Sequence, residues 1–152
     1  MLRRTKGVVA LALAVGMVAG FQTGPAFAVT TLTHNLTGRA EVPGPGDPNG
    51  SGKASITFYP NQHKVCFDLQ WRKIRSPMAS HIHIGEKGVA GNVKVTLFST
   101  TKPLPHTIHR VQGCVHRVKE KLIRRIMNHP RLYYVNIHNK PYPAGALRGQ
   151  LA

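Results

Sequence analysis

Two histidines one residue apart, His81 and His83, are the residues of this chain whose spacing most directly suggests chemistry. They lie in residues 80–85, a short run with the character of a β-strand. In a strand, residues i and i+2 point to the same face, so both imidazoles project to one side while Ile82 projects into the core. This is how a β-protein presents two nitrogen ligands to one metal ion.

A third histidine, His138, lies near the end of residues 133–139, another strand-like run, with Tyr134 and Asn136 on its face. If this strand neighbours residues 80–85, three nitrogens converge, and copper and zinc both accept such a set. The alternative is that His81 and His83 hydrogen-bond to loop backbone and hold the glycine-rich turn that follows them. The sequence leaves both interpretations open.

Catalytic groups other than a metal are hard to find. The chain has few carboxylates, and none is placed to form the acid and base pair of a hydrolase. No serine lies in a nucleophile-elbow pattern, and no glycine-rich loop joins a strand to a helix as in a nucleotide site. We therefore expect no enzyme, with a metal-dependent redox activity as the one plausible exception. The five acids are Glu41, Asp47, Asp68, Glu86 and Glu120.

The elements that must position these histidines are mostly strands. Residues 30–37 are rich in β-branched side chains, and residues 54–58 and 65–71 alternate apolar with polar residues on either side of a Pro-Asn-Gln turn, which predicts an antiparallel hairpin. Further strands are expected at residues 80–85, 93–98, 133–139 and 146–151. Many short strands with turns between them predict an all-β fold, an immunoglobulin-like or Greek-key β-sandwich or barrel.

One short helix is expected in the C-terminal third, near residues 118–128, where apolar residues gather on one side. Its other side carries Lys121, Arg124 and Arg125. The whole chain has 21 Lys and Arg against 5 Asp and Glu, a formal net charge of +16. Such a field attracts polyanions, so we expect an anionic cell-wall or extracellular polymer as partner, bound in part through these three cations.

The first 28 residues match a secretory signal peptide. Arg3, Arg4 and Lys6 precede an uncharged apolar run at residues 7–21, and a small-x-small cleavage signal ends at Ala28. The apolar run is shorter than the roughly 20 residues that a membrane span needs. We therefore expect a cleaved leader, one domain over residues 29–152 without a transmembrane segment, and a secreted product that could associate with the cell wall.

Cys66 and Cys114 are the only cysteines. An even pair in an oxidising compartment predicts one disulfide bond between them.

Read in order, the chain from about residue 31 to 151 resembles a CHRD domain, the module named after chordin. The resemblance implies an immunoglobulin-like β-sandwich or barrel and an extracellular address, and it implies no established activity. It is carried by the segments LTGRAEVP (36–43), GDPNGSG (46–52), VCFDL (65–69), SHIHIG (80–85), GCV (113–115), YYVNIH (133–138) and YPAGALRGQL (142–151).

A fainter likeness is to copper/zinc superoxide dismutase, which also places an H-x-H pair on one strand, a late histidine on another and an arginine near the C-terminus. The matching residues here are His81, His83, His138 and Arg148. The dismutase zinc site needs an aspartate beyond the H-x-H, and no Asp follows Asp68 in this chain. The likeness therefore implies at most a mononuclear copper or zinc site.

Taken together, the sequence predicts a secreted, non-catalytic, basic binding or structural module. The alternative is an extracytoplasmic copper- or zinc-binding protein that uses His81, His83 and His138. Few aromatic residues lie among the cations, so specific nucleic-acid binding is not expected. The oligomeric state, the physiological ligand and the biological process do not follow from the sequence.

Overall fold

The computed structural model describes residues 29–152. The predicted signal peptide, residues 1–28, lies outside the described residues. Strands dominate the described part, which contains a single α-helix and three short 3-10 turns. In chain order the strands and the helix are β1 (Thr30–Thr37), β2 (Ser51–Tyr59), β3 (Lys64–Arg72), β4 (Pro77–Ile84), β5 (Val93–Ser99), β6 (Arg110–Val115), α1 (Glu120–Asn128), β7 (Tyr133–Asn139) and β8 (Leu147–Gln150).

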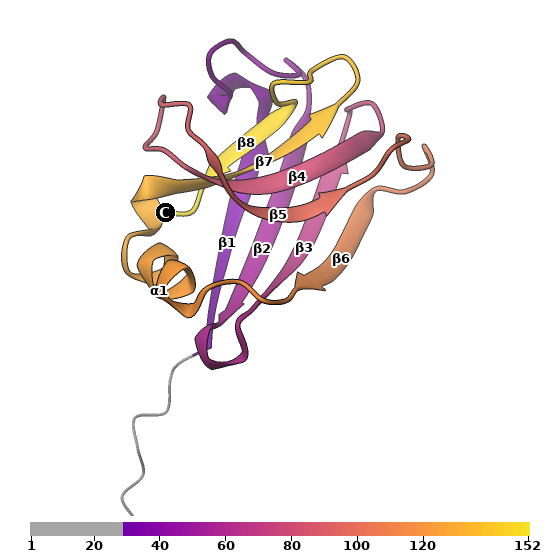
Figure 1. Ribbon diagram of the computed structural model, residues 1–152. Coiled ribbons are helices and arrows are strands. Elements are labelled where there is room, and N and C mark those ends of the chain that lie inside the picture. The colour runs from indigo at the N-terminus through magenta and orange to yellow at the C-terminus, as the bar shows by residue number, and fades with distance from the viewer. Residues whose placement is uncertain (1–28) are drawn as a thin grey trace, which may run out of the picture.

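The eight strands form one antiparallel sheet in the order β5-β4-β7-β8-β1-β2-β3-β6. The sheet coils so that its edge strands, β5 and β6, approach each other, which makes a nearly closed barrel. In Figure 1 the β4 and β5 strands cross in front of β1, β2 and β3. The all-β prediction with one helix is confirmed, and of its two architectures the barrel describes the sheet.

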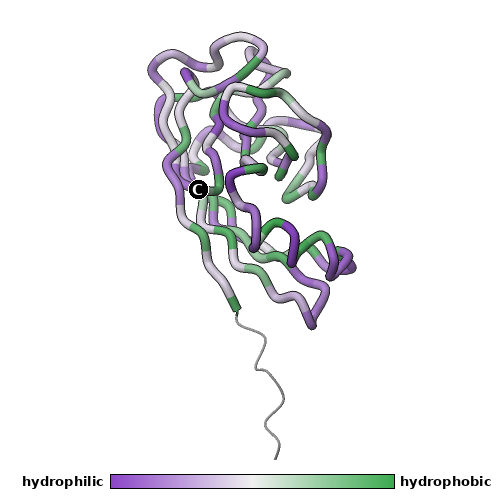
Figure 2. The backbone as a smooth tube through the Cα atoms, turned by 90° about the vertical axis from the view of Figure 1, so that its left-hand side faces the viewer, coloured by the Kyte–Doolittle hydropathy of each residue, from purple (hydrophilic) through white to green (hydrophobic). Residues whose placement is uncertain are grey.

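The predicted strands follow from alternation. In β2, for example, Ala54, Ile56 and Phe58 are buried and the residues between them are not. Figure 2 shows hydrophobic and hydrophilic residues interspersed along the backbone. One strand, β6, was not predicted. Its inward positions are Val111, Gly113 and Val115, which are only partly buried, and its glycine and cysteine interrupt the apolar pattern.

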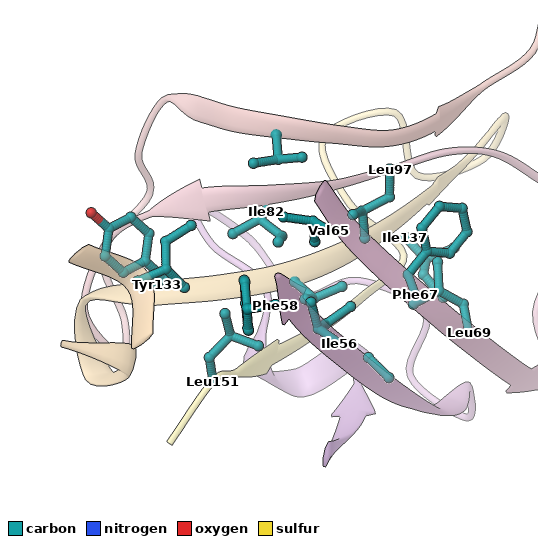
Figure 3. Packing of buried hydrophobic residues seen from close by; sticks show 14 of the residues in the cluster. Ile56, Phe58, Val65, Phe67, Leu69, Ile82, Leu97, Tyr133, Ile137 and Leu151 are labelled. Carbon is teal, nitrogen blue, oxygen red and sulfur yellow. The ribbon is translucent and has the colours of Figure 1, made fainter. Parts of the chain in front are cut away.

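The core fills the inside of the barrel. Figure 3 shows Ile56, Phe58 and Val65 from β2 and β3 facing Ile82 of β4 and Ile137 of β7. Each of these side chains is fully buried, and burying one such side chain stabilises the fold by about 1.5–3 kcal/mol. Helix α1 packs on one end of the barrel through Ile123 and Ile126, both 0% exposed. A rigid barrel is therefore available to hold polar groups on its outer face.

The predicted disulfide bond is present. Cys66 of β3 and Cys114 of β6 lie directly opposite each other in the sheet and are bonded. Both side chains are on the outer face, because their neighbours Val65 and Phe67 point into the core. The bond ties the edge strand β6 to the rest of the barrel.

Within residues 29–152, no helix is both long enough and apolar enough to cross a membrane.

Candidate metal centre

Strands β4 and β7 place three histidines on one outer face of the barrel. The two strands pair antiparallel, with His81 opposite Asn136, His83 opposite Tyr134 and Ala79 opposite His138. Because side chains alternate, His81, His83 and His138 share a face, while Ile82 points to the opposite face and is 0% exposed. The register of these two strands thus supplies the third imidazole.

The three rings lie close enough for one atom to touch them all. Their centroids are 4.9 Å (His81–His138), 5.5 Å (His81–His83) and 6.2 Å (His83–His138) apart. One ring nitrogen from each lies within 4.8 Å of the others. Three atoms with that separation lie within about 2.8 Å of a common point, and zinc–nitrogen bonds measure about 2.0–2.1 Å. Small side-chain adjustments would bring all three nitrogens to bonding distance.

Backbone carbonyls orient two of the rings. His83 Nδ1 lies 2.7 Å from the carbonyl oxygen of Gly91, and His138 Nδ1 lies 2.9 Å from that of Pro143. Since a carbonyl only accepts, each Nδ1 carries the proton and donates it. The lone pair of each neutral ring is then on Nε2. Histidines that bind metals are oriented in this way by a partner for their other nitrogen.

The Nε2 atoms face the interior of the cluster. His138 Nε2 lies 3.1 Å from His81 Nδ1. His83 Nε2 and the Oδ1 of Asn136 are both buried, and neither has a hydrogen-bond partner of good geometry, although Asn136 lies close enough to His81 and His83 to oppose the lowering of their pKa values. A buried polar atom without a partner costs about 1–3 kcal/mol. A bound cation would satisfy both of these orphaned atoms, and the Asn136 oxygen is a candidate fourth ligand.

The histidines are held in the neutral form that metals bind. The pKa of His81 is lowered from 6.5 to about 4, chiefly by burial and in part by the charges of the nearby His138 and His83. The pKa values of His83 and His138 are also lowered, chiefly by burial, although their backbone hydrogen bonds oppose the shift. At neutral pH the rings therefore carry no net charge, and the one proton between them is the one that His81 Nδ1 donates to His138 Nε2, which must shift to His81 Nε2 when a metal binds.

A glycine allows the loop between β4 and β5 to close over the cluster. A Cβ atom at Gly91 would lie 1.7 Å from the carbonyl oxygen of Ile84, so only glycine fits there. This close approach brings the Gly91 carbonyl onto His83, and its N–H donates to the Tyr134 hydroxyl over 3.3 Å. The glycine-rich turn and the histidines thus hold each other in place.

Arg148 lies on the same face but does not reach the histidines. The His83 and Tyr134 rings stack, 4.8 Å apart and 8° from parallel, and the Arg148 guanidinium lies 3.4 Å from the Tyr134 centroid. Strand β8 pairs with β7 on the side away from β4, so the tyrosine ring separates Arg148 from His83. Arg148 is 2% exposed and donates to the carbonyl of Glu86 over 2.8 Å.

Glu41 is a buried carboxyl next to this arrangement that sequence reasoning missed. It is 5% exposed, and its Oε1 has no hydrogen-bond partner. Burial raises its pKa to about 7, although the charge of Arg148 and a backbone hydrogen bond from Val42 oppose the shift. No local pattern marks Glu41, since it lies about a hundred residues before Arg148 in the chain.

The three cations predicted to bind anionic polymers lie elsewhere, and so do two further histidines of a loop. Lys121 and Arg125 are exposed on α1, and Arg124 donates to Glu120 and Asn61. The loop histidines His106 and His109 are exposed and do not join the cluster, which contains three imidazoles and no carboxylate among the described residues. That composition matches a mononuclear site and lacks the aspartate of the dismutase zinc site.

The fold and the site together define a class of protein: a small all-β barrel with a cluster of imidazoles on the outer face of its sheet. The comparison with protein families identifies the family: the family model of the CHRD domain matches residues 32–151. The chain therefore belongs to the CHRD domain family, as the sequence segments predicted. Neither the curated proteins nor the solved structures gave a match.

Proposed function

We propose that this CHRD domain binds one transition metal ion, copper or zinc, through His81, His83 and His138. The observation that carries the proposal is the convergence of three neutral ring nitrogens within 4.8 Å of one another. The two backbone carbonyls that fix the rings and the orphaned His83 Nε2 support it. Imidazole nitrogen suits both metals, and copper(II) binds a given nitrogen site more tightly than zinc.

Metal content tests the proposal directly. Protein purified without a histidine tag and stripped with a chelator should take up one equivalent of Cu²⁺ or Zn²⁺ and unfold at a higher temperature with the metal present, because a ligand bound to the folded state stabilises it. Elemental analysis after dialysis and calorimetric titration give the stoichiometry. If a variant in which all three histidines are replaced takes up as much metal as the unmodified protein, the site is refuted.

The proposed role is binding without a catalytic step. The proposed setting is outside the cell, which the Cys66–Cys114 disulfide supports, because such bonds persist in oxidising compartments.

The charge favours a second function, attraction to anionic polymers of the cell wall or extracellular space. The net charge of +16, of which Arg3, Arg4 and Lys6 in the predicted leader contribute three, is the observation behind it. Exposed cations are screened by salt, with a Debye length of about 10 Å at 0.1 M. We therefore expect the protein to bind heparin resin at low salt and to elute steeply as salt rises. Retention that is indifferent to salt would contradict this function.

A further inference from the structure

The outer face of strands β1, β2, β3 and β6 carries a second surface, on the side of the barrel away from the histidines. Its outward side chains form rows across the strands. One row joins Asn35, Lys53, Gln70 and Arg110, which are direct partners in the sheet register. At about 4.8 Å between neighbouring strands, this row extends about 14 Å. All four side chains are exposed.

A second row runs parallel to the first, two residues further along the strands. It joins Thr37, Ser51 and Arg72. Between the rows lie residues whose side chains point inward, including Leu36 and Trp71, which are 1% and 2% exposed. The two rows are therefore the walls of a groove whose floor lacks protruding side chains.

The groove is an open hollow of about 1140 Å³. Both rows line it, and Lys73 and residues 107–110 line its end at the β3–β6 side. Lys73 has a φ of 57°, a left-handed conformation that costs a non-glycine residue about 1 kcal/mol or more and is concentrated at functional sites. The hollow is large enough for several sugar units.

The groove is strongly cationic. Lys53, Arg72, Lys73 and Arg110 line it, and its lining contains no Asp or Glu. Only Arg110 is neutralised, by a bidentate contact with Asp68 outside the groove. Within the described part of the chain no carboxylate pairs with the other three cations. A polyanion therefore has three uncompensated charges to bind.

The polar groups between these cations indicate which polyanion. Asn35 and Gln70 amides and the hydroxyls of Thr37 and Ser51 alternate with the charges, and such groups both donate to and accept from sugar hydroxyls. Single-stranded nucleic acid needs exposed aromatic rings on which its bases stack. Of the rings in the lining, Trp71 is buried and His109 is exposed, which leaves one small ring for stacking, so an acidic polysaccharide fits the groove better.

We propose that this groove binds a linear acidic polysaccharide, with its anionic groups at Lys53, Arg72 and Lys73 and its hydroxyls at Asn35 and Gln70. This inference gives a site to the anionic-polymer binding proposed above and rests on it, and it is independent of the metal. It also places the main contact with the polymer on the sheet, whereas the sequence predicted it at the cations of helix α1.

Two variants of equal charge change test the groove. The groove variant is Lys53→Gln/Arg72→Gln/Lys73→Gln, and the control is Lys119→Gln/Lys121→Gln/Arg125→Gln, exposed cations at α1. The probe is a heparin hexasaccharide, titrated calorimetrically into the full domain. The groove variant should lose about tenfold or more in affinity, and the control less than about threefold.

An uncharged variant separates recognition from general attraction. Asn35→Ala/Gln70→Ala should lower hexasaccharide affinity about three- to tenfold through lost hydrogen bonds, with an unchanged salt dependence. Equal losses in the two charge variants would refute the groove and leave the anionic-polymer function standing. No binding by the unmodified domain would refute both. Tighter, groove-dependent binding of a thymidine hexanucleotide would overturn the polysaccharide assignment.

Discussion

Replacing His83 with alanine should lower the affinity for Cu²⁺ or Zn²⁺ about 100-fold or more. Loss of even an outer-shell partner of a metal ligand typically costs 10- to 100-fold, and His83→Ala removes a ligand itself. His83 is the sharpest choice because its Nε2 is buried without a partner while its Nδ1 is occupied by Gly91. Competition with a chromophoric chelator measures the affinity.

Two further variants keep this experiment interpretable. His83 stacks on Tyr134, so circular dichroism must show that the variant folds. His81→Ala removes a less buried ring of the same cluster and should weaken binding similarly. His106→Ala, an exposed loop histidine, is the matched control and should leave the affinity unchanged. A His106 variant that loses as much affinity as the His83 variant would mean that surface histidines bind the metal.

The sequence predicted an all-β sandwich or barrel and, on condition that two strands are neighbours, all three histidines of the cluster, for clear physical reasons. Apolar residues at every second position, such as Ile56 and Phe58, are all buried together only if the segment is a strand with one buried face. The same two-residue period places His81 and His83 side by side before any pairing is known. These are local properties, and local patterns are what a sequence displays.

The rest of the site depends on tertiary structure. His138 meets the pair only because β7 lies beside β4 in one register, which includes an irregularity between Pro77 and Ala79. The carbonyls of Gly91 and Pro143 are backbone groups, which any residue type carries, so no motif marks them as partners of the rings. The burial of Glu41 likewise arises from packing against Gly145, far away in the chain.

Replacing Glu41 with glutamine should stabilise the protein at neutral to alkaline pH by about 3 kcal/mol. The pKa of Glu41 is raised from 4.5 to about 7, mainly by burial, and one pKa unit corresponds to about 1.4 kcal/mol. Between these values the folded state holds a proton that the unfolded state has released. Unfolding therefore becomes easier as pH rises from 4.5 to 7, and the loss is complete above pH 7.

Glutamine has the shape of the protonated carboxyl and does not titrate, so the two proteins should be equally stable at pH 4 and diverge as pH rises. His81 titrates in the same range with the opposite sign, since its lowered pKa removes stability as pH falls from 6.5 towards 4. This effect is the same in both proteins, so the difference between their free energies of unfolding in urea reports the contribution of Glu41 alone. Glu86→Gln, at an exposed residue, is the control. If Glu41→Gln were instead the less stable protein at pH 8, the ionised Glu41 would be stabilised by Arg148. The attraction between the Glu41 carboxylate and Arg148 would then outweigh the desolvation of the carboxylate, and burial would not raise the pKa of Glu41.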